Sequence, residues 1–570
     1  MDEIRVHLSR PDALLQQALL GCVSGLIAGS VIVLFRYLVE GTQEAMLPGS
    51  GPENYEALAD IWRLLLPVSG SLILAFVFWR FSMGIQVLGV ARVMERLAYH
   101  QGRMTWRGFL LQFLGAAISI ISGHSVGREG PHAYLGAAAG SLLGQRLELP
   151  NNSIRILAGS GVAAGIAASF NTPLAGVVFA LEVVMLEYTV ASFTPIILAA
   201  VSATVISNAA LGGEPAFSVP PLVLASLKEL PMVLALGFAA GVVSSGFIHL
   251  LQNVAERSKG LMVWWRVIIA GVVVGLCSWL VPEVMGIGYD SIDMALLGQL
   301  AAGMLSAMMI MKIIATSASV GLGIPGGMIG PALFIGAVLG SLVGIGAEYL
   351  YPGTPSLSGF YALLGMGAVM GASLQAPLAA LIAMLELTHN PRIILPGMLA
   401  VIIATLTASE LFRKESLFVT MLKANGLAYD ANPVLQVLRR SGVASLMNTS
   451  FEKLEAVILP AQAEQVLRKG VEWLLIKIED KPVYLLPAVD LAVHLRTLEN
   501  NLPESIDLRQ IPGHRYQVAP VHLRATLQEA YDMFTAGKAE ALYIERMTAP
   551  GIWRTYGILT REMVTSAYQY

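Results

Sequence analysis

The sequence predicts an all-α polytopic membrane protein built from internal repeats, followed by a small α/β domain. Of its 570 residues, 55% are hydrophobic and only 13% are charged, and the mean hydropathy is +0.66; soluble domains carry about a quarter charged residues. Charge returns only near the C-terminal end. These observations divide the chain into an N-terminal segment at 1–12, membrane repeats at 13–212 and 213–425, a linker at 426–442 and an α/β domain at 443–570.

Apolar segments follow one another through the first three quarters of the chain. The first, Ala13–Val39, follows a polar start and lacks a cleavage motif, so we interpret it as a membrane helix and not as a signal peptide. Several later segments are shorter than the ~20 residues of a full span, and such broken helices are tolerated where protein or water surrounds them. The later segments are Trp62–Trp79, Phe109–Ile121, Ala133–Leu143, Ile154–Ser169, Leu174–Leu186, Phe193–Ala210, Pro231–Leu251, Val263–Val281, Leu296–Ile314, Ala332–Ile345, Phe360–Ser373, Leu378–Leu387 and Ile393–Leu411.

Glycine- and proline-rich motifs of the first half recur in the second half in the same order. Such a duplication is typical of transporters whose substrate site lies between the repeats. The identities alone do not show whether the repeats are inverted. The clearest pairs are Gly127-x-x-Gly130-Pro131 with Gly327-x-x-Gly330-Pro331, Gly159-x-Gly161 with Gly365-x-Gly367, and Pro173-Leu174-Ala175 with Pro377-Leu378-Ala379.

A glycine-rich turn, Gly123–Pro131, carries the carboxylate of Glu129 between two apolar segments. Glycines let backbone N–H groups approach a bound group, and Pro131 suits the first turn of the helix that follows. The positive end of that helix then points back at the turn, where an anion is the natural ligand. Glu129 therefore competes with a free anion for this place, although an acid here could also serve only to stabilise its own helix.

The runs Gly127–Pro131, Gly327–Pro331 and Asn171–Gly176 together resemble the CLC family of chloride channels and chloride/proton exchangers. The resemblance spans about Ala13–Asn425, and the C-terminal region is similar to a degenerate tandem pair of CBS motifs. It implies inverted repeats whose broken helices point their N-termini at the permeating ion. It also implies a homodimer in the lipid bilayer of a bacterial inner membrane, with one anion pathway per subunit and both termini in the cytoplasm.

The resemblance gives Glu129 the role of the gate and gives the backbone of the two turns the role of binding anions. The turn residues are Gly127, Arg128, Gly130, Gly327, Met328, Ile329 and Gly330. Three positions depart from the family pattern. Leu88, beside Gly89, replaces a serine that donates a hydroxyl to the anion, and Phe418 replaces a tyrosine. Val183 stands where exchangers carry their internal proton-transfer glutamate.

The departures lead to an expectation about transport. A hydrogen bond to a charged group contributes roughly 1.5–3 kcal/mol, so the loss of two hydroxyls predicts weak central binding without loss of conduction. Because Val183 cannot carry a proton, we expect passive, channel-like conduction of chloride and other small monovalent anions, gated by Glu129. Two alternatives stay open, because some family exchangers lack that acid: a proton-coupled chloride/proton antiporter, and an anion or nucleotide sensor with little flux.

Other polar residues in the membrane part have structural interpretations. We expect Arg128 to form a salt bridge and His132 to face the vestibule outside the membrane. Glu182 and Glu386 occupy equivalent repeat positions, which favours helix packing or capping. The two cysteines fall in apolar segments, which favours free thiols over a disulfide.

The C-terminal region keeps only part of a nucleotide-binding pattern. CBS pairs often bind adenine nucleotides through an Asp after a Gly-x-x-Thr turn, but Met563 stands at that place, and the first copy keeps Asp490 beside Pro487. We therefore expect a dimer-stabilising regulatory module, with Asp490 as the candidate nucleotide contact. The sequence has no metal-ligand cluster, nucleophile–base arrangement or Gly-x-x-x-x-Gly-Lys loop, and its net charge is −3. We expect no enzyme activity, metal, resident cofactor or nucleic-acid partner.

Overall fold

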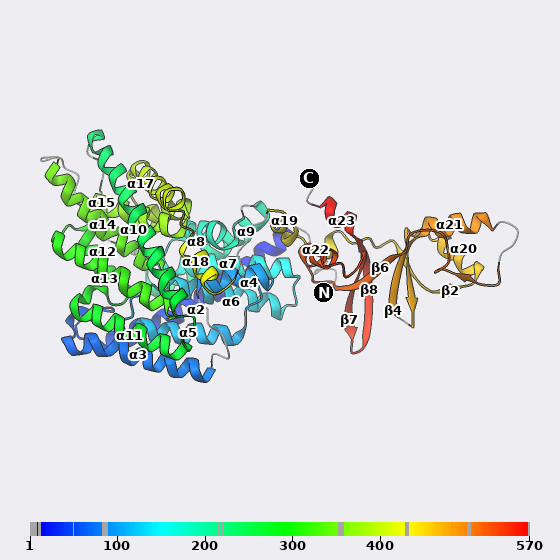
Figure 1. The fold of residues 1–570 in the computed structure, drawn as a ribbon, viewed down its shortest axis with the longest axis horizontal. Coiled ribbons are helices and arrows are strands. Elements are labelled where there is room, and N and C mark those ends of the chain that lie inside the picture. Colours follow the sequence, from blue (N-terminus) through cyan, green and yellow to red (C-terminus); the bar gives the residue numbers. More distant parts are fainter. Residues whose placement is uncertain are drawn as a thin grey trace. The chain divides into compact units, whose positions relative to one another are not determined.

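A computed structural model describes residues 8, 13–49, 51–81, 89–187, 189–213, 217, 222, 224, 226–350, 358–427, 433–479, 481–498 and 503–567. The chain divides into two compact units, drawn in Figure 1. The membrane unit comprises Leu15–Leu147 and Ile154–Asp430. The C-terminal unit comprises Met1–Leu14, Glu148–Ser153 and Ala431–Tyr570.

The membrane unit is helical throughout (Figure 1, blue to yellow). Nine helices of the described residues are long and apolar enough to cross a membrane, so the chain is a multi-pass membrane protein. Its α-helices are α2 (Leu14–Met46), α3 (Asp60–Phe81), α4 (Val90–Tyr99), α5 (Trp106–Ile121), α6 (Glu129–Arg146), α7 (Asn151–Phe170), α8 (Pro173–Phe179), α9 (Val190–Leu211), α10 (Leu230–Arg257), α11 (Val263–Leu280), α12 (Tyr289–Leu296), α13 (Ala302–Gly321), α14 (Ile329–Leu350), α15 (Ser358–Leu374), α16 (Pro377–Thr388), α17 (Ile394–Leu406) and α18 (Leu417–Ala424).

Short helical turns join or extend these helices. The π-helix η2 (Ala180–Met185) continues α8 until Leu186 adopts φ 53°, and η6 (Thr407–Leu411) continues α17. The 3₁₀ turns are η1 (Tyr55–Ala57), η3 (Leu227–Glu229), η4 (Pro282–Val284) and η5 (Pro391–Ile393). Residues of both repeats share one continuous apolar core.

The two repeats use the same glycine crossing. In the first repeat, α6 meets α7 so closely that a Cβ on Gly161 would lie 1.9 Å from the carbonyl oxygen of Gly136. In the second, a Cβ on Gly365 would lie 2.2 Å from the carbonyl oxygen of Gly336 on α14. Only glycine permits such an approach, so the recurring glycine motif is a helix-packing motif, as predicted.

The C-terminal unit repeats one strand–helix–strand–strand–helix pattern. Its sheet has the order β1-β3-β4-β6-β7-β8, with β1·β3 and β6·β7 parallel and β3·β4, β4·β6 and β7·β8 antiparallel. Each copy has its own apolar core, and a third cluster joins them across the sheet. This arrangement is the predicted CBS-like pairing. The elements are α19 (Pro433–Arg440), η7 (Val443–Ser445), β1 (Phe451–Glu455), β2 (Val457–Ile458), α20 (Pro460–Arg468), β3 (Trp473–Ile478), β4 (Lys481–Pro487), α21 (Ala488–Thr497), β5 (Ile506–Asp507), β6 (Tyr516–His522), α22 (Leu527–Thr535), β7 (Ala541–Ala549), β8 (Ile552–Thr560) and α23 (Arg561–Ser566).

Candidate functional site

The N-termini of α6 and α14 meet at the centre of the membrane unit. The two turns that precede these helices pair through their backbones: the Gly127 amide donates to the Gly327 carbonyl at 2.8 Å, and the Gly327 amide donates to the Gly127 carbonyl at 2.6 Å. Because each helix carries a partial positive charge at its N-terminus, two such ends now face one place. The arrangement attracts an anion.

The carboxylate of Glu129 already occupies this place. Glu129 is fully buried, at 0% exposure, in the first turn of α6. Its Oε2 accepts a hydrogen bond from the amide of Gly330 on α14 at 3.2 Å, and its Oε1 accepts one from the hydroxyl of Tyr289 at 3.0 Å. The carboxylate of Glu129, which belongs to the first repeat, therefore accepts hydrogen bonds from two groups of the second repeat.

The turns offer fewer free amides than the sequence predicts. We expected Gly127 and Gly327 to donate to an anion, but their amides are used by each other's carbonyls. The amide of Gly330 is held by Glu129. Because the first amides of a helix have no partner within the helix, the turn positions left to contact an anion directly are Arg128 and Gly130 at the start of α6 and Met328 and Ile329 at the start of α14.

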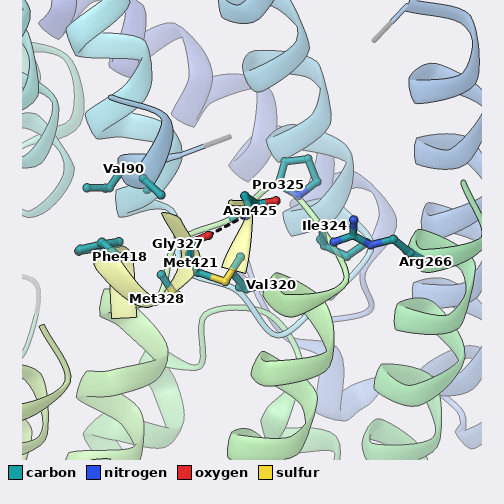
Figure 2. Close-up of a pocket in the computed structure, with 14 residues that line it drawn as sticks. Val90, Arg266, Val320, Ile324, Pro325, Gly327, Met328, Phe418, Met421 and Asn425 are labelled. Atoms are coloured by element: carbon teal, nitrogen blue, oxygen red, sulfur yellow. Dashed lines mark hydrogen bonds between the residues drawn. The ribbon is translucent and has the colours of Figure 1, made fainter. Parts of the chain in front are cut away.

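A narrow cavity lies beside the paired turns (Figure 2). Its volume is about 40 Å³, which exceeds the roughly 10–15 Å³ that one water needs. Phe418, 2% exposed, lines this cavity, and its place on the anion pathway stays a prediction. The lining residues are Val90, Ala91, Gly130, Arg266, Val320, Gly323, Ile324, Pro325, Gly326, Gly327, Met328, Phe418, Met421 and Asn425.

Gly89 follows Leu88, the position at which the family's serine would donate a hydroxyl to the anion. Gly89 has φ 74° and precedes α4, and its amide donates to Oε1 of Gln112 at 2.7 Å. The amide of Gly89 is therefore already used. The neighbouring residue Val90 lines the cavity. Leu88 lies outside the described residues, so its predicted place at the anion site stays a prediction.

Arg266 lines the cavity and is not among the residues predicted from the sequence. In Figure 2 it lies on the opposite side of the pocket from Val90 and Phe418. It is 8% exposed; its Nη2 donates to the carbonyl of Gly321 at 3.3 Å, and its Nε has no hydrogen-bond partner in the described part of the chain. A lone cation inside the apolar segment Val263–Val281 was the signal that could have identified it.

Arg128 forms the expected salt bridge. Its Nη1 lies 3.1 Å from Oε1 of Glu40 on α2, and the same carboxylate oxygen lies 2.8 Å from Nε of Arg36. Its guanidinium lies 5.0 Å from the centre of the Tyr289 ring. Arg128 therefore links α2 to the start of α6 and to the tyrosine that contacts Glu129.

His132 does not face a vestibule, contrary to the prediction. It is fully buried, and its ring meets the ring of Phe35 edge to face with the centroids 5.2 Å apart. Neither ring nitrogen has a hydrogen-bond partner among the described residues. Because His132 follows Glu129 by three residues on α6, it lies on the turn that packs against α2.

Lys312 is a second buried cation that is not among the residues predicted from the sequence. It lies on α13, and its ammonium group donates to three backbone carbonyls of the loop before α12, those of Val284 (3.1 Å), Gly286 (3.0 Å) and Ile287 (3.3 Å). The loop that delivers Tyr289 is thus held by a charge inside the protein. As with Arg266, a lone lysine within an apolar segment was the available signal.

Val183 lies on η2 and is 5% exposed. The neighbouring Glu182 accepts hydrogen bonds from the amides of Leu378 (3.2 Å) and Ala379 (2.6 Å) at the start of α16. The position predicted to lack a proton carrier is therefore apolar and buried. The acid beside it caps a helix of the other repeat.

The C-terminal unit contains a separate cavity of about 500 Å³. Thr560 lies at its wall and caps α23 by accepting the amide of Met563 at 3.4 Å. Asp490, the candidate nucleotide contact, is not one of the described residues that line this cavity. The lining residues are Trp473, His514, Tyr516, Gln517, Phe534, Gly537, Ala539, Glu540, Thr560, Arg561 and Glu562.

Both Cys22 and Cys277 are free thiols, as predicted, and Sγ of Cys22 lies 3.1 Å from Oγ of Ser202. Within the described ranges, no group of three or more His, Cys, Asp or Glu side chains could hold a metal ion.

Comparison with known sequences identifies relatives of the membrane unit. The family model for voltage-gated chloride channels matches residues 70–409, more than half of the chain. A putative chloride channel protein, ClcB-like, of Ralstonia nicotianae is 35% identical over 61% of this chain and 82% of that protein. The H⁺/Cl⁻ exchange transporter ClcA of Salmonella paratyphi B is 29% identical over 75% of this chain and 93% of that protein.

Solved structures match the fold. A slow cyanobacterial Cl⁻/H⁺ antiporter has a TM-score of 0.63 at 23% identity and covers 72% of this chain and 97% of its own. A eukaryotic CLC transporter has a TM-score of 0.63 at 19% identity, covering 96% of this chain and 98% of its own. The second match extends over both the membrane unit and the C-terminal unit.

Proposed function

This chain belongs to the CLC family of voltage-gated chloride channels and is an anion transporter, and we propose that it exchanges chloride for protons across the membrane. This is the alternative to the passive conduction expected from the sequence. The H⁺/Cl⁻ exchange transporter ClcA and the cyanobacterial Cl⁻/H⁺ antiporter favour it. The position of Glu129 carries the proposal, because one carboxylate can both block the anion site and bind a proton.

In the proposed cycle, Glu129 alternates between two states. While ionised, its carboxylate accepts the amide of Gly330 and holds the place that a chloride ion would take. When it takes up a proton it loses its charge and its attraction to the positive end of α14, so a chloride ion enters. When the proton leaves toward the side from which the chloride came, the carboxylate returns and expels the chloride toward the side from which the proton came. Each turn of the cycle thus moves chloride and a proton in opposite directions.

Passive conduction of chloride and other small monovalent anions is the second candidate. The buried, apolar Val183 favours it, because a proton that travels through the membrane unit finds no titratable side chain there. The name of the ClcB-like relative, a putative chloride channel, agrees with this candidate. Under either candidate, Glu129 is the gate.

Flux measurements in proteoliposomes separate the two candidates. An outward chloride gradient is imposed, and chloride release and internal pH are recorded together. Exchange predicts protons moving uphill against their own gradient, and Glu129→Gln should abolish that movement while chloride flux continues. Chloride flux with no proton movement in the wild-type protein would establish the passive candidate. Unchanged flux and coupling in Glu129→Gln would remove the gate assignment.

We further propose a homodimer in a bacterial inner membrane with both termini in the cytoplasm and with the CBS-like domain as a regulatory module. The family relationship supports this assembly. Subunit counting by single-molecule photobleaching in liposomes should give two copies per particle.

Titration of the purified full chain with a labelled adenine nucleotide should show no saturable binding, since Met563 stands where the ribose-binding Asp is expected.

A further inference from the structure

The phenol of Tyr289 is the side-chain donor to the Glu129 carboxylate. Tyr289 begins α12, and its hydroxyl lies 3.0 Å from Oε1 of Glu129, while the amide of Gly330 lies 3.2 Å from Oε2. Both oxygens are thus held from the second repeat. The amide is backbone and would serve any anion at the start of α14, whereas the phenol is a side chain of this particular sequence.

The ring that carries this hydroxyl is fixed on several sides. The guanidinium of Arg128 lies 5.0 Å from the ring centre. The rings of Phe217 and Phe170 lie 5.3 Å and 6.2 Å away, at interplanar angles of 78° and 42°. Because the ring has little freedom to lose, its hydrogen bond to Glu129 costs little ordering entropy.

We propose that Tyr289 is a latch that holds the Glu129 carboxylate in the anion pathway and sets how readily the gate opens. This proposal rests on the gate function proposed for Glu129. Tyr289 is a positioning residue, because it acts through Glu129. A hydrogen bond to a charged group biases an equilibrium by roughly tenfold or more, so removing the hydroxyl should shift the gate toward its open state by that factor.

The latch also predicts a change in the pH dependence of flux. A donated hydrogen bond favours the ionised carboxylate, so its loss should let Glu129 take up a proton, and the gate open, at higher pH. The charged groups that act on the pair are Arg36, Arg128, Glu53 and Lys312, and all four are retained in Tyr289→Phe. A shift of the pH profile therefore reports on the hydroxyl.

Chloride flux through proteoliposomes tests the latch in four proteins: wild type, Tyr289→Phe, Glu129→Ala and the double variant. Tyr289→Phe should raise flux roughly tenfold or more and move the half-maximal pH upward. The same substitution should add nothing in the Glu129→Ala background. The matched control is Tyr361→Phe. The hydroxyl of Tyr361 on α15 donates to Oε2 of Glu229 on η3 at 2.8 Å, so this variant also removes a buried hydrogen bond between a tyrosine and a glutamate. Chloride flux through Tyr361→Phe should equal that through the wild type.

The outcomes distinguish the latch from the gate. If Glu129→Ala changes flux and Tyr289→Phe does not, the latch is wrong and the gate stands. An undiminished effect of Tyr289→Phe in the Glu129→Ala background would also overturn the latch. If Glu129→Ala changes nothing, both fail. Should Tyr289→Phe not fold, Phe217→Leu replaces it: this variant keeps the hydroxyl but frees the ring, and it should raise flux to a smaller extent.

Discussion

The rings of Phe418 and Phe179 meet edge to face, with their centroids 6.2 Å apart and their planes at 84°. Phe179 ends α8 in the first repeat, and Phe418 lies in the first turn of α18. The contact fixes Phe418 in the wall of the cavity beside the paired turns. The wall at this point is therefore a buried, apolar ring, at a position where a hydroxyl could donate to an anion.

Phe418→Tyr should tighten chloride binding. The added hydroxyl extends the ring by one donor, and a hydrogen bond to an anion contributes roughly 1.5–3 kcal/mol, or about tenfold or more in Kd. Isothermal titration of the detergent-solubilised protein with chloride measures the change. Met421→Leu, on the same helix and cavity wall but without a new donor, is the control. An unchanged Kd in Phe418→Tyr would show that residue 418 does not contact the bound anion.

Each repeat supplies one glutamate that caps a helix of the other repeat, and the two caps should contribute equally to the stability of the membrane unit. Glu182 accepts two amides of α16, and Glu386 accepts the amides of Leu174 (3.0 Å) and Ala175 (2.7 Å) of α8. Loss of a helix cap costs about 0.5–2 kcal/mol, so Glu182→Ala and Glu386→Ala should each lower the free energy of unfolding by that amount. Denaturant unfolding in detergent measures this, and a loss in only one variant would contradict the equivalence of the repeats.

Gly161→Ala should destabilise the membrane unit strongly. The new Cβ would lie 1.9 Å from a backbone carbonyl of α6, which no side-chain rotation relieves, and overpacking of this kind costs about 1–3 kcal/mol or more. Gly246→Ala on α10 is the control, because nothing lies within 4 Å of its added Cβ. A helical glycine replaced by alanine without a clash should gain about 0.5–1 kcal/mol. Equal thermal midpoints for the two variants would contradict the crossing geometry.

Glu53, in the loop between α2 and α3, should make stability depend on pH. Burial raises the pKa of its carboxyl from 4.5 to about 7; the Arg128 charge opposes this rise and the Asp290 charge adds to it. Because the folded pKa exceeds the unfolded one, the stabilisation from the bound proton is complete below about pH 4.5 and is lost as the pH rises to about 7.

The thermal midpoint of Glu53→Gln should therefore gain on that of the wild type as the pH rises from 5 to 8, since the variant has no proton to lose. Glu44→Gln, an exposed position on α2, removes the same charge and is the control. A difference between Glu53→Gln and wild type that is the same at both pH values would contradict the raised pKa of Glu53.

Much of the architecture follows from local patterns in the sequence. Hydropathy located the membrane helices because a helix buries its own backbone polar groups and needs only an apolar surface. The recurring glycine motifs revealed the duplication, and the Gly-x-x-Gly-Pro frame placed Glu129 at a helix N-terminus. The alternation of strands and helices after residue 439 identified the paired C-terminal domain.

The sequence by itself therefore determined the long apolar helices, the duplication and the acid at the start of α6, but not the short helices α4, α12 and α18. Only the tertiary structure decided which groups meet that acid. The pairing of Gly127 with Gly327 consumed two amides expected to bind anions, and Tyr289 reached Glu129 from 160 residues away. His132 became buried against α2 instead of facing a vestibule. These outcomes depend on how the two repeats pack together, and local periodicity carries no information about contacts between distant segments.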